Sequence, residues 1–530
     1  MMAQVVRAQG GMVVAPHHLA AEAGCSVLRE GGNAVEAMIA ASATIMVAYP
    51  HMNALGGDNF WLISKGGGRP IGIDAAGPAA GFADTGFYRD AGQEEIPSRG
   101  PLAALTVAGV VSGWQEALNI SADWGGKMPL DRLLEAAVNH ARDGVAAPHT
   151  LHANAAGKRG ELEDVPGFAE VFLPGGAPVA EGAQFKQPRV AATLERLAEA
   201  DLDDFYRGDL ARSMAQDLKA AGSPLRLDDF EAHNALRVEP LSVGLRQACV
   251  YNMPPPTQGL ASLMILGIFE RLGIEMSDGF DYVHALVESA KQAFLVRDAH
   301  ITDPTYMDVD PADFLAGAAL DERANAIDSK TALPWPQEAK PGDTVWLGAI
   351  DAAGNAVSFI QSIYWEFGSG LVLPESGVLW QNRGSSFSLD DTAVNVLKPG
   401  RRPFHTIQPA LALFSDGRVM LYGTMGGEGQ PQTQSVIYTR YALFGQDLAQ
   451  AINNPRWLLG RTWGAETANL RIESRFAPDV IKALRAAGHD LEVVGAYDEV
   501  MGHAGALVRH PDGSIEGASD PRCDGAAVGF

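Results

Sequence analysis

The chain has 530 residues, of which 47% are hydrophobic and 20% charged, a balance typical of a folded protein with a large core. Its formal charge is −24 at pH 7, which argues against a broad surface for nucleic acid or anionic membranes, because both need clustered Lys and Arg. The three cysteines, Cys25, Cys249 and Cys523, are far apart and form neither a disulfide framework nor a CxxC metal motif.

The N-terminal region predicts buried structure rather than a targeting signal. Residues 1–18 contain no apolar stretch long enough for a signal peptide. Residues 34–50 are apolar but include Glu36 and end at Pro50, so we expect residues 17–50 to form a buried helix and not a membrane span. A cytoplasmic location is the expectation.

The pattern of the chain changes near residue 340. Helical patterns dominate from about 100 to 335, and the polar, proline-containing interval 324–340 predicts an exposed linker. Short strands follow, with helices expected near 433–443 and 478–487. A helix-rich first part and a strand-rich second part predict an α+β protein in which strands are layered against helices.

A hairpin is predicted directly after the linker. Turn residues at 340–343 and 351–355 flank two apolar runs, 345–350 and 356–363. If Ile350 lies opposite Ala356, then Thr344 lies opposite Ser362, and two hydroxyl groups meet at the open end of the hairpin. Thr–Ser pairs also stabilise ordinary sheets, so this pair does not by itself establish catalysis.

Two further segments in the strand-rich part carry possible chemistry. Gly426 and Gly427 follow a predicted strand and can present backbone N–H groups to an oxyanion, with a simple tight turn as the alternative. Arg383 has the planar guanidinium that binds carboxylates, with a surface position as the alternative. The chain lacks GxSxG, HExxH and Walker motifs, and no metal site is predicted.

Five segments, taken in order, resemble the gamma-glutamyltranspeptidase family: 32–63, 253–266, 354–382, 423–427 (GTMGG) and 517–522 (GASDPR). The resemblance covers nearly the whole chain. It implies an α+β fold of the N-terminal nucleophile hydrolase type, a four-layer αββα sandwich. It also implies a precursor that cuts itself between Asp343 and Thr344. The large subunit (1–343) and the small subunit (344–530) would then form one sandwich as a heterodimer, and pairing of such heterodimers is left open.

The resemblance also assigns catalytic roles. Thr344 matches the nucleophile, and its freed α-amino group, with an unperturbed pKa of about 7.7–8.0, can act as the base that a threonine hydroxyl needs. Ser362 matches the hydroxyl partner of the nucleophile, and Gly426 and Gly427 match the oxyanion-hole glycines. No metal or organic cofactor is implied.

The departures from the family pattern concern the substrate. The arginine that clamps the α-carboxylate of glutamate is absent from residues 72–80, and the acidic residue that holds the α-amino group corresponds to a serine. The candidate substrate-binding residues are Arg383, His405, Thr406, Tyr364 and Ser386. The pocket has therefore lost both halves of an amino-acid clamp while gaining a guanidinium and an imidazole, which are candidate carboxylate binders.

A site built for charged hydrogen bonds rejects ligands that leave those groups unpaired. We therefore expect a small carboxylate-bearing amide as substrate, with oxamate hydrolysed to oxalate and ammonia, as in the branch of the family that includes oxamate amidohydrolase. Two alternatives stay open. One is a gamma-glutamyltransferase, glutathione hydrolase or related acylase of the same family, and the other is an inactive, unprocessed binding relative.

Overall fold

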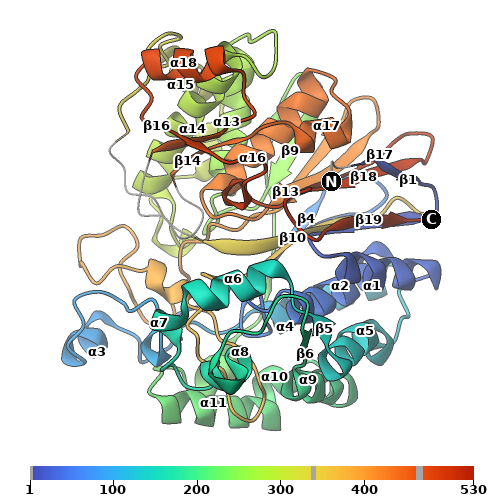
Figure 1. Ribbon diagram of the computed structural model, residues 1–530, viewed down its shortest axis with the longest axis vertical. Helices are drawn as coiled ribbons and strands as arrows, with labels where there is room; N and C mark the ends of the chain where they lie inside the picture. The colour runs from blue at the N-terminus through green and yellow to red at the C-terminus, as the bar shows by residue number, and fades with distance from the viewer. Residues whose placement is uncertain (1–3, 336–341, 461–468) are drawn as a thin grey trace.

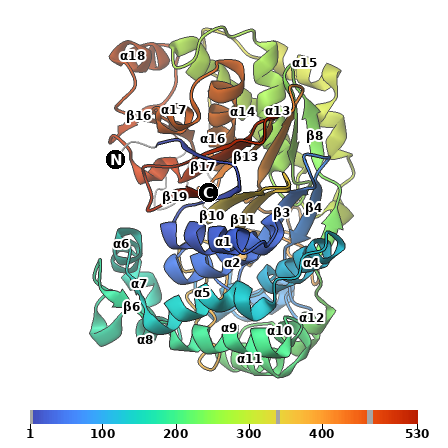
Figure 2. The ribbon, with the colours of Figure 1, turned by 90° about the vertical axis from the view of Figure 1, so that its right-hand side faces the viewer.

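The computed structural model describes residues 4–335, 342–460 and 469–530, and they form four layers (Figure 1). Two antiparallel sheets lie face to face, with helices covering the outer face of each (Figures 1 and 2). This arrangement confirms the predicted αββα sandwich.

The first sheet carries the predicted hairpin in its centre. In spatial order its strands are β19 (Ala526–Gly529), β2 (Gly11–Ala15), β10 (Asp343–Asp351), β11 (Ala356–Tyr364), β3 (Asp58–Ser64), β4 (Ile71–Ala75) and β7 (Leu236–Val238). The second sheet has the order β1 (Val6–Ala8), β18 (Ile515–Ser519), β17 (Ala504–Arg509), β13 (Val419–Thr424), β12 (Ala410–Phe414), β9 (Ala248–Asn252) and β8 (Leu241–Gly244). Both sheets contain strands from residues 1–343 and from residues 344–530. The division of the chain into two subunits at this boundary remains a prediction.

Helices cover the first sheet in two tiers (Figure 2). The inner tier is α1 (His18–Arg29), α2 (Ala34–Ala48) and α4 (Val110–Asp123), and α2 in turn packs against α5 (Leu130–Asp143), which contacts α9 (Pro188–Ala200). The second sheet is covered by α13 (Gly259–Arg271), α14 (Phe280–His300), α16 (Gly429–Tyr438) and α17 (Leu448–Asn453). Among the described residues, no helix has the length and apolar character needed to cross a membrane.

Shorter elements complete the fold. The remaining α-helices of the described residues are α3 (Thr85–Asp90), α6 (His149–Gly157), α7 (Arg159–Leu162), α8 (Phe168–Phe172), α10 (Asp204–Arg207), α11 (Asp209–Ala221), α12 (Leu227–Ala232), α15 (Gly317–Asn325) and α18 (Pro478–Ala486), and a short 3-10 helix, η5 (Arg383–Ser386), carries Arg383. Two small sheets are formed by β5 (Val145–Ala146) with β6 (Gln184–Phe185), and by β14 (Trp457–Leu459), β15 (Leu470–Glu473) and β16 (Leu491–Val494).

The single helix predicted over 17–50 is wrong, because the structure has two helices there. Asn33 accepts hydrogen bonds from the N–H groups of Val35 and Glu36, and the Glu36 side chain accepts from the Asn33 N–H in return. This capping box starts a new helix at Ala34. The helices expected near 433–443 and 478–487 are present as α16, which continues as a π-helical turn, and α18. Of the predicted linker 324–340, residues 336–340 lie outside the described residues.

Trp346 fixes the distance between the two sheets beside the hairpin's open end. Its indole lies in the core between the sheets, in a notch at Gly423 of β13 and Gly505 of β17. A Cβ on Gly423 would lie 2.2 Å from the indole ring, and one on Gly505 would lie 2.5 Å from it. Because alternate residues of a strand share a face, Thr344 faces the same gap between the sheets as Trp346.

Candidate active site

Thr344 lies at the start of β10, where the hairpin opens. The predicted register is confirmed along the hairpin, in which Ile350 pairs with Ala356. At the open end a β-bulge places two residues of β11, Ser362 and Ile363, opposite Thr344. The predicted neighbourhood of Thr344 and Ser362 is therefore present, with one extra residue in β11.

Two hydroxyl groups hold the peptide bond that precedes Thr344. Thr344 Oγ1 and Ser362 Oγ each donate a hydrogen bond of 2.5 Å to the carbonyl oxygen of Asp343. Gln430 Nε2 donates to Thr344 Oγ1 at 3.2 Å, and its Oε1 accepts from the N–H of Gln408 at 3.1 Å. The threonine hydroxyl thus stands beside a carbonyl group that a second hydroxyl polarises, the arrangement that an N-to-O acyl shift needs.

Gly342 packs directly against the predicted oxyanion loop. A Cβ on Gly342 would lie 3.0 Å from Thr406 Oγ1, 3.2 Å from Gly427 Cα and 3.6 Å from the Tyr364 ring. Gly426 and Gly427 have φ values of 113° and 47°, a region that glycine occupies without strain. The segment before Thr344 therefore fills the space into which the glycine loop and Tyr364 project.

Gln258 holds the glycine loop in place. Its Nε2 donates to the carbonyl oxygens of Gly427 at 2.7 Å and Thr406 at 2.6 Å. Its Oε1 accepts from Arg297 Nη1 at 3.0 Å, and Arg297 Nη2 forms an ion pair of 2.7 Å with Glu428. All these side chains are buried, so the two segments that carry Gly427 and Thr406 are fixed relative to each other.

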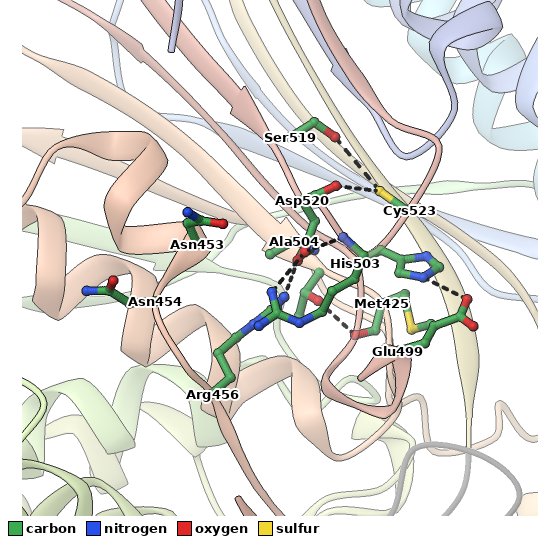
Figure 3. Close-up of polar contacts among 12 residues, drawn as sticks. Met425, Asn453, Asn454, Arg456, Glu499, His503, Ala504, Ser519, Asp520 and Cys523 are labelled. Carbon is green, nitrogen blue, oxygen red and sulfur yellow. Dashed lines mark hydrogen bonds and ion pairs between the residues drawn. The ribbon is translucent and has the colours of Figure 1, made fainter. Parts of the chain in front are cut away.

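A second buried cluster supports the start of the same loop (Figure 3). The N–H of Met425 donates to the carbonyl oxygen of His503 at 3.3 Å, and the N–H of Ala504 donates to Asp520 Oδ2 at 2.7 Å. Asp520 is also ion-paired with Arg456. The GASDPR motif therefore supplies a carboxylate that anchors the backbone next to the glycine loop.

Arg383 is buried in the wall beside Tyr364, so the alternative of a surface arginine is wrong. Its guanidinium lies 3.3 Å from the centroid of the Tyr364 ring and donates to the carbonyl oxygen of Phe404 at 2.8 Å and to Thr406 Oγ1 at 3.3 Å. Ser386 Oγ donates to the same Phe404 carbonyl at 3.4 Å. Burial lowers the pKa of Arg383 to about 10, so the group stays cationic at neutral pH. Four of the predicted substrate-binding residues thus share one wall.

Asp58, to which the sequence analysis assigned no role, lies at the start of β3 beside this wall. It pairs with Ser362 across β3 and β11. Its Oδ1 accepts three hydrogen bonds of 3.1 Å, from the N–H groups of Gly77 and Gly109 and from Gln381 Nε2. Burial nevertheless raises the pKa of Asp58 to about 7.

His405 is the fifth predicted substrate-binding residue and faces Asp58. Its Nε2 lies 3.4 Å from Asp58 Oδ2, and its ring packs edge-on against Phe60 with the centroids 5.0 Å apart. Among the described residues, neither ring nitrogen has a hydrogen-bond partner. Burial, with the positive charges of Arg383 and Arg402, holds the pKa of His405 well below its usual value. His405 is therefore a neutral imidazole, which can share a hydrogen bond with an anion but supplies no charge.

The side chain of Asp343 is buried in an acidic environment. Its Oδ1 accepts from the N–H of Thr344 at 2.7 Å, and its Oδ2 has no hydrogen-bond partner among the described residues. Burial and the nearby carboxylates of Glu366 and Glu499 raise the pKa of Asp343 well above its ordinary value. Glu366 and Glu499 also line a cavity of about 480 Å³. The uncut chain therefore favours a protonated Asp343.

A candidate metal-binding group lies elsewhere, at the seam of α14 and α18. His284, Glu288 and His489 bring ligand atoms within 4.8 Å of one another. These groups are already partnered, since His284 Nδ1 lies 2.9 Å from His489 Nε2 and Glu288 forms an ion pair of 2.7 Å with Lys291. The contacts explain the cluster as a polar anchor without an ion.

Sequence reasoning missed Asp58, Gln258 and Gln430. Asp58 and Gln258 lie inside segments that resemble the family, and Gln430 follows one of them by three residues, yet neither an amide nor a single acid has a spacing rule that marks it as functional. The signal for Asp58 was an acid between two glycines and an apolar run, LGGDNFWLI, where a carboxylate must find buried partners.

The protein has the fold of the N-terminal nucleophile hydrolases. In this sandwich, the start of a central strand of one sheet meets a glycine loop at the end of the facing sheet. Its fold matches a crystal structure of cephalosporin acylase from Bacillus halodurans with a TM-score of 0.91 and 32% identity, covering 99% of this chain and 97% of that one. The chain belongs to the gamma-glutamyltranspeptidase family, whose model matches residues 20–530.

Two relatives cover 98% of this chain and 98% of their own length. The oxamate amidohydrolase proenzyme of Klebsiella pneumoniae subsp. pneumoniae is 54% identical over 521 residues. The glutathione hydrolase-like YwrD proenzyme of Bacillus subtilis is 41% identical over 527 residues. The predicted family and the expectation of an enzyme are confirmed.

Proposed function

We propose that this protein is a proenzyme that cuts itself between Asp343 and Thr344 and then hydrolyses a small carboxylate-bearing amide. The observation that carries the proposal is the pair of hydroxyl groups, from Thr344 and Ser362, on the carbonyl oxygen of Asp343. Such a pair supplies both a nucleophile next to the scissile bond and a donor for the oxyanion.

In the proposed self-cleavage, Thr344 Oγ1 attacks the carbonyl carbon of Asp343, and the hydroxyl of Ser362 stabilises the oxyanion. The C–N bond then breaks, and the nitrogen of Thr344 receives the proton that leaves Oγ1. Water hydrolyses the resulting ester, which leaves a carboxylate on Asp343 and a free α-amino group on Thr344. Residues 1–343 and 344–530 remain together as a heterodimer.

In the proposed turnover, the freed α-amino group takes the proton of Thr344 Oγ1 as the hydroxyl attacks the substrate amide. The N–H groups of Gly426 and Gly427 receive the oxyanion. The leaving amine takes a proton and departs, and water releases the acid from the acyl-enzyme. Departure of Gly342 from the glycine loop opens the space in which the acyl group binds.

The composition of the pocket wall supports a short anionic acyl group. Arg383 supplies one buried guanidinium beside Thr406 and Tyr364, which matches one carboxylate. Oxamate has one carboxylate and one primary amide, and it yields oxalate and ammonia. The relative at 54% identity, named as an oxamate amidohydrolase proenzyme, supports oxamate as the first substrate to try.

The test has two steps. Intact mass and N-terminal sequencing of the purified protein should find a small fragment that begins Thr-Val-Trp-Leu. Rates with oxamate, glutathione and a gamma-glutamyl anilide are then compared, and oxamate should be the fastest. A chain that stays whole after prolonged incubation contradicts self-cleavage, and a higher rate with glutathione favours the gamma-glutamyl alternative.

A further inference from the structure

Three neighbouring strands present polar side chains to the gap between the sheets in one row. Thr344 on β10 and Ser362 on β11 are followed by Asp58 on β3, which pairs with Ser362. The residues two positions further along these strands all lie in the core between the sheets: Trp346, Ile360 and Phe60. Because alternate residues share a face, Asp58 points into the same gap as Thr344.

Asp58 is the acid whose charge acts on Arg383. Burial raises the pKa of Asp58 and lowers that of Arg383, and each charge opposes the effect of burial on the other, as the Tyr364 phenol also does for Arg383. Both side chains are buried, and among the described residues Asp58 Oδ2 makes no hydrogen bond. Other titratable groups that face this pair are His405, the phenols of Tyr206 and Tyr364, and Arg402, which is held by Asp74 and Asp303.

A bound carboxylate changes the charge balance of this pocket. Arg383 and an ionised Asp58 together are neutral, so a substrate carboxylate on Arg383 adds one uncompensated negative charge to a buried site. Burying an unpaired charge is costly, and a second carboxylate near Asp58 favours its neutral form. Protonation of Asp58 is the least costly way to remove this excess negative charge.

We propose that Asp58 is a proton-linked counter-ion of Arg383: it balances the guanidinium in the empty pocket, and it binds a proton, which it shares with the neutral His405, when a substrate carboxylate takes over that balance. The proton comes from solvent, one for each anion bound. The neutral Asp58 then donates through Oδ2 to His405 Nε2, and His405 carries its own hydrogen on Nδ1. The inference rests on the proposed function only in taking a carboxylate as the ligand.

The proton linkage makes binding weaken as pH rises. Below the pKa of Asp58, about 7, the pocket already holds the proton, so affinity is independent of pH there. Above that pKa the proton must be taken up on binding, and affinity falls by up to about tenfold for each pH unit.

The Asp58→Asn variant tests the proton linkage while keeping the hydrogen bonds that Asp58 makes in the fold. Asparagine keeps Oδ1 as the acceptor for Gly77, Gly109 and Gln381, so the local structure retains its three hydrogen bonds. The variant is neutral at every pH, as the proton-bound aspartic acid is. Asp74→Asn is the matched control, because Asp74 is a buried acid on the neighbouring strand that pairs with Arg402 instead.

The experiment is calorimetric titration of the self-cleaved enzyme with oxalate between pH 6 and 9, in two buffers of different protonation enthalpy, together with KM for oxamate. In the wild type and in Asp74→Asn, we expect affinity to fall above pH 7 with uptake of up to one proton. Asp58→Asn should show no such fall and should bind oxalate at least about tenfold more tightly than wild type at pH 8.5. The α-amino group of Thr344 titrates in the same pH range, but it is still present in Asp58→Asn. Any proton uptake that this variant retains on binding oxalate therefore belongs to the α-amino group.

The outcomes distinguish the two proposals. An unchanged pH dependence in Asp58→Asn, or weaker binding than wild type at pH 8.5, overturns the proton linkage even if oxamate is hydrolysed. If Asp58→Asn does not fold, the wild-type titration still tests the proton linkage. Binding of oxalate without proton uptake, or failure of oxalate to bind, overturns it. If oxalate binds with the expected linkage but oxamate is not hydrolysed, the linkage stands and the proposed function fails.

Discussion

Gly342 and Gly427 are in direct contact: a Cβ on Gly427 would lie 2.9 Å from the nitrogen of Gly342. Under the proposed function, Gly342 of the uncut chain occupies the place beside the predicted oxyanion loop where an acyl group would lie. The uncut chain would then block its own pocket, so hydrolytic activity should appear only as cleavage proceeds.

Gly427→Ala tests this contact. The left-handed conformation costs a residue with a Cβ about 1–2 kcal/mol, and the new methyl group also meets Gly342. We expect slower self-cleavage and lower turnover, followed by mass spectrometry over time. Gly445→Ala is the control, because Gly445 has a φ of 65° with open space around it. Equal cleavage rates in the two variants would contradict a role for the contact.

Thr344→Ala should abolish both self-cleavage and turnover, because it removes the proposed nucleophile. We expect a single chain of 56.1 kDa and a rate lower by about 10³-fold or more. Thr344→Ser keeps the hydroxyl and should still cut. A Thr344→Ala protein that is found cleaved at the same bond would exclude the threonine as nucleophile.

Ser362→Ala removes one of the two donors on the carbonyl oxygen of Asp343. Loss of such a donor typically costs about 10²–10³-fold in rate, and self-cleavage should slow accordingly, measured as the half-life of the uncut chain. Ser358→Ala, on the same strand, is the control: its hydroxyl accepts from Trp346 Nε1 at 3.0 Å, so its loss should lower stability and spare cleavage. The same slowing in both variants would assign the effect to stability.

Arg383→Gln tests carboxylate recognition. Leaving a buried carboxylate without its partner costs about 2–5 kcal/mol, so KM for oxamate should rise at least about thirtyfold with a smaller change in kcat. An amide that lacks the carboxylate should be an equally poor substrate for both proteins. If KM for oxamate is unchanged, the carboxylate binds elsewhere.

The stability of the uncut chain should depend on pH through Asp343. Its pKa is raised in the folded state, so its contribution is fully present below the unfolded value of about 4 and is lost as pH rises through the folded value. Uncut Thr344→Ala should therefore lose stability as the pH rises above about 4, measured in denaturant titrations at a series of pH values. The double variant with Asp343→Asn should lose less, and identical slopes would contradict this role.

The sequence predicted much of this site because its groups follow strand periodicity. The turns that flank the apolar runs 345–350 and 356–363 predicted the hairpin register, and the structure shifts that register only at the bulge opposite Thr344. The helix over 17–50 was wrong because the apolar pattern continues across the break, and only the capping box of Asn33 and Glu36 marks it.

Other parts of the site depend on contacts between distant segments. Gln258 donates to the carbonyl oxygen of Gly427, 169 residues away, and Gln430 donates to the hydroxyl of Thr344, 86 residues away. Asp58 accepts hydrogen bonds from groups that are 19, 51 and 323 residues away. No local pattern encodes such partners. The burial of Arg383 is of the same kind, because it follows from the tertiary position of Tyr364 and Phe404.

The strand order of the first sheet has a consequence for the cut protein. β10 lies between β2 and β11, and β19 lies on the other side of β2, so segments from before and after the proposed cut alternate within one sheet. The two pieces are interleaved and cannot separate without breaking the hydrogen-bond ladders that build the molecule. After cleavage, dissociation and unfolding become a single event, and reassembly becomes a reaction between two molecules. The mature protein should therefore gain thermal stability with concentration, a dependence that its single-chain precursor lacks.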